Sequence, residues 1–143
     1  MSTAAVISRA PVVTLTNGLR VANFSSPHPF NFEDGSVLEA CDPVRVAAGA
    51  LEREEETRPW GYKDGIFAVV PKFSLSEQVF TLLLQLQQDD DVDIVLIPFP
   101  VLEALRNARQ DGGQTLLEAL SKVGTICVKD RLTKAIYINR FCR

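Results

Sequence analysis

The side chain of this sequence that titrates near neutral pH is His28, the only histidine, which lies in the segment Pro27-His28-Pro29. Nucleophilic catalysis needs a nucleophile, a general base and a group that orients the base. Cys41 offers a thiol, His28 an imidazole, and Asp34 or Asp42 a carboxylate. We therefore take His28, Cys41 and Asp34 as the candidate catalytic residues. The alternative interpretation is a rigid loop, in which His28 bonds only to backbone groups.

Other motifs for a metal or a cofactor are missing from the sequence. Structural zinc normally takes four closely paired Cys or His ligands, whereas Cys41, Cys127 and Cys142 are widely separated. The acidic run 89–93 lacks the glycine and the distal glutamate of an EF-hand loop, so we expect a solvated turn there. No glycine-rich phosphate loop and no Gly-x-Ser-x-Gly elbow occur. We predict no cofactor and no bound metal.

The composition indicates one globular domain. A chain of 143 residues that is 46% hydrophobic and 23% charged fits a single domain over 11–143, preceded by a flexible tail at 1–10. The net charge of -3 disfavours binding to nucleic acid or to anionic membranes. No apolar run is long enough to span a membrane. Three cysteines without a CxxC pair favour the cytoplasm or another reducing compartment, with Cys127 in a strand core and Cys142 in a tail.

The first half of the chain predicts short antiparallel strands. Asn17-Gly18 separates two apolar runs, 12–15 and 19–23, and predicts a hairpin with a type I′ turn. A second turn at 33–36 follows Phe30, Asn31 and Phe32. Asp42-Pro43 then predicts the start of a helix. We interpret the charge run 52–58 as a solvated helix end or loop, and Trp60 as a plug of the core, with a partner anchor as the alternative.

The second half predicts a parallel unit and a closing hairpin. The continuous apolar runs 66–70 and 94–97 are typical of buried parallel strands, and Ser74 with Glu77 fits a capping box for a helix between them. Short helices are expected at 100–108 and 114–120. Strands at 125–129 and 134–138 flank a four-residue turn. The predicted fold class is α/β, with α+β as the alternative: a mixed sheet with an N-terminal β-hairpin, a central right-handed βαβ unit and a C-terminal β-hairpin.

The order of these motifs resembles a known group of proteins. The Pro-His segment, the helix with Leu102-Glu103-Ala104-Leu105-Arg106 and the pair Arg140-Phe141 are similar to features of small phage and prokaryotic proteins that carry an Asn-Leu-Thr-Pro-His motif. Pro27-His28 matches the end of that motif, and Asn23-Phe24-Ser25-Ser26 departs from its start. The resemblance implies a phage or viral origin and brings no activity with it.

Apolar side chains in predicted loops favour a protein that binds other proteins. Our first hypothesis is a non-enzymatic interaction or structural protein, a subunit of a larger assembly or a self-associating chain. Its candidate interaction residues are Phe30, Phe32, Trp60, Phe73 and Phe99. The first alternative is a small enzyme or metal-dependent hydrolase centred on His28. The second alternative is a nucleic-acid-binding module that uses the basic C-terminal hairpin, with Lys122, Lys129, Arg131, Lys134, Arg140 and Arg143.

Overall fold

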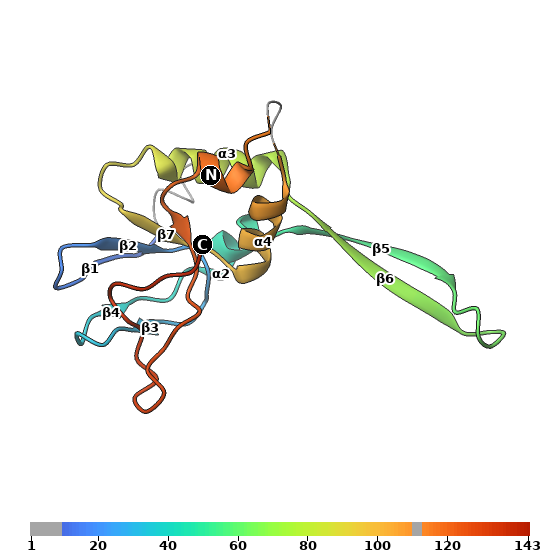
Figure 1. Cartoon of the computed structure of the whole chain (residues 1–143), viewed down its shortest axis with the longest axis horizontal. Coiled ribbons are helices and arrows are strands. Elements are labelled where there is room, and N and C mark those ends of the chain that lie inside the picture. The colour runs from blue at the N-terminus through green and yellow to red at the C-terminus, as the bar shows by residue number, and fades with distance from the viewer. Residues whose placement is uncertain (1–9, 110–112) are drawn as a thin grey trace.

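A mixed sheet forms the centre of the body, as the sequence predicts, and it has four strands. The computed structural model describes residues 10–109 and 113–143, so most of the predicted tail lies outside the described residues. Figure 1 shows the sheet in the body of the molecule. Its strand order is β1 (Val12–Thr14), β2 (Arg20–Asn23), β7 (Ile94–Leu96) and β8 (Val123–Gly124). The β1–β2 pair is antiparallel, whereas the β2–β7 and β7–β8 pairs are parallel.

Strand β7 is covered on both faces, and its alternating side chains divide the apolar interior into two clusters. Val95 and Ile97 belong to the larger cluster, whereas Leu96 belongs to the smaller one. The larger cluster includes residues of α3 (Glu77–Gln87), α4 (Phe99–Asn107) and α5 (Leu116–Ala119). The smaller cluster includes Phe32 and Leu38, from the segment of β3 (Phe30–Asn31) and β4 (Val37–Leu38), together with Ile136.

The first predicted hairpin forms, but with a different turn. The amide of Leu15 donates to the carbonyl of Leu19, and the amide of Gly18 donates to the carbonyl of Leu15. Gly18 has a φ of +87°, whereas Asn17 keeps a negative φ, so the turn is not type I′. This is the three-residue hairpin loop with its glycine in the left-handed region. The type I′ prediction was wrong because it required two positive φ angles.

The predicted strand at 66–70 does not enter the sheet of the body. It lies in β6 (Phe67–Ser74), which pairs over its whole length with the antiparallel β5 (Glu52–Pro59). In Figure 1 this hairpin projects from the body, joined to it between α2 (Pro43–Ala48) and α3. The helix α3 is capped by Ser76, whose hydroxyl accepts from the amide of Val79, and not by Ser74. The parallel connections instead join β2 to β7 and β7 to β8.

A close contact explains where α2 ends. Asp42 caps its start by accepting a hydrogen bond from the amide of Val44, as the sequence predicts. Gly49 ends it, and the fully buried ring of Phe24 lies directly against the α-carbon of this glycine. A β-carbon at position 49 would lie 2.2 Å from Cε1 of Phe24. Glycine is therefore required here by the packing of the ring.

The C-terminal segment folds over the body without forming the predicted regular strands. Ile136 pairs with Phe32 and Lys129 as isolated bridges, and Thr125 pairs with Cys142. The four-residue turn is present, because the amides of Leu132 and Thr133 both donate to Asp130. The guanidinium of Arg143 donates to the carbonyls of Leu117, Leu120 and Val123, which ties the segment to α5 and β8.

Cys127 and Cys142 are joined by a disulfide. Cys127 is exposed and lies outside the strands, which corrects its assignment to a strand core. A disulfide of this kind persists in oxidising environments. The bond is therefore at odds with the expectation of a reducing compartment. The third cysteine, Cys41, is free and buried.

We expect Gly49→Ala to destabilise the protein by about 1–3 kcal/mol, because the new methyl group overlaps the ring of Phe24. Denaturant unfolding measures the change. The double variant Gly49→Ala/Phe24→Leu is the control, because the smaller side chain makes room for the methyl group. Losses that simply add in the double variant would contradict the proposed clash.

We expect Cys127→Ser to lower the free energy of unfolding by about 3 kcal/mol, because the disulfide closes a loop of 15 residues. Thermal or denaturant unfolding under oxidising conditions measures this loss. Reduction of the unmodified chain should reproduce the loss and leave the Cys127→Ser variant unchanged. Equal stability of the oxidised and reduced chain would argue against the bond.

Candidate functional site

The His28 loop is held by a buried asparagine. Asn23 is completely buried at the end of β2, and its side chain makes four hydrogen bonds. Its Oδ1 accepts from the amides of Ser25 and Ser26, and its Nδ2 donates to the carbonyls of Ser26 and Glu39. Because a buried amide with all of these partners is strongly fixed, Asn23 sets the path of the chain toward His28. Sequence analysis missed this role, because Asn23 lies inside an apolar strand pattern.

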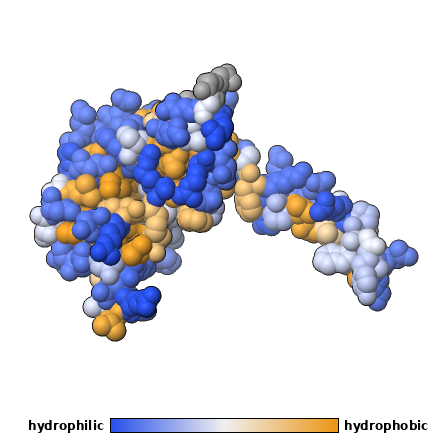
Figure 2. Space-filling view, viewed as in Figure 1, coloured by the Kyte–Doolittle hydropathy of each residue, from blue (hydrophilic) through white to orange (hydrophobic). Residues whose placement is uncertain are grey.

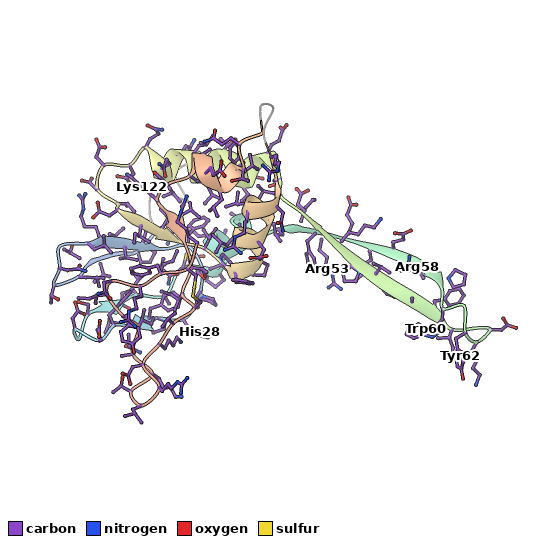
Figure 3. The ribbon with its side chains drawn as sticks, viewed as in Figure 1. His28, Arg53, Arg58, Trp60, Tyr62 and Lys122 are labelled. Carbon is purple, nitrogen blue, oxygen red and sulfur yellow. A yellow bond between two sulfur atoms is a disulfide. The ribbon has the colours of Figure 1, made fainter. Side chains whose placement is uncertain are left out.

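The three candidate catalytic side chains are not assembled into a site. His28 is exposed on the body (Figure 3), and its backbone amide donates to Oγ of Ser26. Cys41 is buried, and burial raises the pKa of its thiol, which is the opposite of an activated nucleophile. No hydrogen bond joins the side chains of His28, Cys41 and Asp34 in the described part of the chain.

Asp34 has a structural task instead. Its carboxylate accepts from the amide of Thr16 at 2.8 Å and from the amide of Ser36 at 2.8 Å. It thereby joins the β1–β2 turn to the β3–β4 turn. These two backbone amides, that of Thr16 first, lower the pKa of Asp34 from its ordinary value of 3.8 to about 2.

The acidic run before β7 is also used for structure. Asp93 accepts from the amide of Arg20 and forms a bidentate pair with its guanidinium, at 3.1 Å for Nε. The hydrogen bonds from Arg20 lower the pKa of Asp93. Within 10–109 and 113–143, no group of three or more His, Cys, Asp or Glu side chains could hold a metal ion.

The five candidate interaction residues divide into two groups. Phe32 is buried in the smaller cluster and Phe30 packs against it, so these two residues belong to the interior. Trp60, Phe73 and Phe99 are exposed. The interpretation of Trp60 as a core plug was wrong, since Figure 3 places it, with Tyr62, at the far end of the projecting hairpin.

We call the hairpin of β5, β6 and the loop 60–66 the arm. Eight residue pairs join its strands, which corresponds to a length of about 27 Å. All residues of β5 are exposed, and so are most of β6. A two-stranded hairpin is marginally stable alone in water.

Figure 2 shows apolar groups between polar ones along the surface of the arm. The exposed fractions of its large apolar residues are 58% for Trp60, 88% for Tyr62, 47% for Ile66, 60% for Phe67, 54% for Val69 and 59% for Phe73.

Alternation along the strands gives the arm two different faces. We call one the open face, and its β6 side chains are all apolar: Phe67, Val69, Pro71 and Phe73. Its cross-strand pairs are Pro59 with Phe67, Thr57 with Val69, Glu55 with Pro71, and Arg53 with Phe73. The opposite, charged face carries Glu52, Glu54, Glu56, Arg58 and Lys72.

Apolar residues are partly covered on the charged face and exposed on the open face. Lys72 pairs with Glu56 at 2.8 Å across the charged face. Ala68 and Val70 on this face are half-buried, because the long side chains beside them cover part of their surface. Phe67, Val69 and Phe73 on the open face stay exposed. The open face is therefore the apolar surface that remains available to a partner.

The open face leads into a hollow at the root of the arm. We call it the root groove, and its volume is about 210 Å³. Its lining is apolar: Ala50, Leu51, Phe73, Pro98, Pro100 and Val101. Phe99, next to it at the start of α4, is 52% exposed. Cavities of roughly 150 Å³ with apolar walls accommodate a benzene ring, so this hollow is large enough for one aromatic side chain.

The sequence of β5 is compatible with two structures, a solvated helix end and an exposed strand. The segment Glu52-Arg53-Glu54-Glu55-Glu56-Thr57-Arg58 is almost free of apolar residues, which is equally typical of a solvated helix end. Only its partner β6 makes it a strand. The alternation of Phe67, Val69 and Phe73 with smaller or polar residues is the signal that could have indicated a half-exposed strand.

We expect the stability of the folded chain to fall as the pH decreases from about 4 toward 2. The pKa of Asp34 is lowered in the folded state, so its contribution is present above the ordinary value of 3.8 and is lost as the carboxylate is protonated. Unfolding of Asp34→Asn across this range should show a smaller dependence on pH. Asp64→Asn, in the exposed loop of the arm, is the control and should keep the original slope. Equal slopes for Asp34→Asn and the parent chain would contradict this role.

The candidate function rests on the structure, because comparisons with known proteins found no match: no family model, no curated protein and no solved structure matches this chain. Among the described residues, no helix has the length and apolar character needed to cross a membrane. The arm with its open face and root groove is the candidate functional site.

Proposed function

We propose that this protein is a non-enzymatic interaction subunit that holds a protein partner with its arm. The observation that carries the proposal is the open face, where Phe67, Val69 and Phe73 are each more than half exposed on a projecting two-stranded hairpin. Exposed apolar rows cost solubility, and they are typical of surfaces that a partner covers. The hairpin, marginal by itself, gains stability from such a partner.

The charges of the arm favour a protein partner over a nucleic acid. Two-stranded ribbons also enter DNA grooves, but this use needs cations that neutralise phosphates. Strand β5 carries Glu52, Glu54, Glu55 and Glu56 against Arg53 and Arg58. Such an acidic strand is repelled by a phosphate backbone. The basic C-terminal segment lies on the body and not on the arm.

We expect Val69→Glu to release the chain from its assembly, because the new carboxylate lies in the middle of the open face. Size-exclusion chromatography with light scattering gives the mass of the purified chain, and native gel filtration gives its size in lysate of the source cells. The parent chain should exceed its monomer mass of 15.8 kDa in at least one of the two, and Val69→Glu should return it to 15.8 kDa.

The matched control is Ile66→Glu, which places the same charge at a similarly exposed residue outside the open face. It should leave the mass of the parent assembly unchanged. A parent chain that stays at 15.8 kDa both when purified and in lysate would overturn the proposal. Equal loss of mass with both variants would show that the open face is not the binding surface.

A further inference from the structure

We infer that the partner of the arm is a second copy of this chain, and that two arms pack antiparallel through their open faces. This inference rests on the proposed function. In this arrangement Phe67, near the tip of one arm, enters the root groove of the other copy, and the contact occurs twice by symmetry. A self-complementary patch of this kind is what a twofold dimer requires.

Antiparallel packing brings matching residues together. If the pair Pro59–Phe67 of one arm lies opposite Arg53–Phe73 of the other, then Thr57–Val69 lies opposite Glu55–Pro71. Each phenylalanine near a tip thus meets a phenylalanine at a root, and Phe73 is itself a wall of the root groove. The register that pairs the apolar side chains is also the one that fills the groove.

The two charges of the open face are paired with each other, and the root groove decides between parallel and antiparallel arms. Arg53 and Glu55 form an ion pair at 3.0 Å along β5. Parallel arms related by a twofold axis would place β5 of one copy over β6 of the other, so Phe67 would lie beside the tip of its partner and far from the root groove. Antiparallel arms place β5 over β5, so this ion pair lies opposite Pro59 and Thr57 of the other copy, while Phe67 lies opposite Phe73.

The distribution of charge along the arm points the same way. The root half, 52–56 with 70–74, has four glutamates against Arg53 and Lys72, a net charge of -2. The tip half, 57–69, has Arg58 and Lys63 against Asp64, a net charge of +1. An antiparallel pair therefore places the positive end of each arm beside the negative end of the other. The opposite signs favour antiparallel over parallel arms, and the presence of an exposed aromatic tip and an apolar root groove on the same arm selects a second copy as the partner.

Chemical cross-linking of the full chain tests the register. The double variant Arg53→Cys/Pro59→Cys, treated with a short bis-maleimide, should give a covalent dimer of twice 15.8 kDa. The two positions lie six residues apart on one strand, about 20 Å, so a short linker cannot join them within one copy. Of the native cysteines, Cys41 is buried and the other two are bonded to each other.

The matched control is Glu52→Cys/Arg58→Cys, with the same spacing on the charged face, which should give no covalent dimer. Dimers from Pro59→Cys alone would indicate parallel arms and overturn the register. As a second measurement, Phe67→Ala should raise the dissociation constant of the dimer by roughly tenfold or more, because a ring leaves each groove. A high mass in lysate, without cross-linking of the purified double variant, would overturn the second copy as partner and leave the proposed function standing.

Discussion

The burial of β7 on both faces is the constraint on which the rest of the body depends. Its side chains alternate between two apolar clusters, so neither cluster forms without this strand. Helices must cover one face, and the β3–β4 hairpin with the C-terminal segment must cover the other. The bidentate pair of Asp93 with Arg20 fixes where β7 begins beside β2. Register and layering therefore follow from a short stretch of chain.

Those parts of the fold whose signals are local could be predicted from the sequence. The hairpin at Gly18, the cap of α2 by Asp42 and the helix near 100–108 each depend on a few neighbouring residues. The partner of an apolar strand is not a local property. Residues 66–70 look like a buried parallel strand by composition, and only pairing with β5 reveals an exposed hairpin. The disulfide could not be predicted either, since spacing alone does not give connectivity.

For the candidate interaction residues, residue type alone did not separate the exposed side chains from the buried ones. Trp60, Phe73 and Phe99 are exposed apolar groups, whereas Phe32 fills the interior. Proximity in sequence suggested a group of His28, Cys41 and Asp34, but Asp34 is occupied by backbone amides and Cys41 by core packing. Asn23 shows the reverse case, since a polar residue within an apolar strand organises the nearby loop.

The insertion of the arm between α2 and α3 separates the proposed binding surface from the core of the body. Glu52 and Ser74 face each other across the first rung of the ladder, so the chain leaves the body and returns to it at neighbouring positions. A shorter, longer or altered hairpin can be grafted there while β7 and its two clusters stay intact. Under the proposed function, selection can change the partner at residues that bear little of the stability of the body. The same junction makes the body a scaffold on which other hairpins can be displayed.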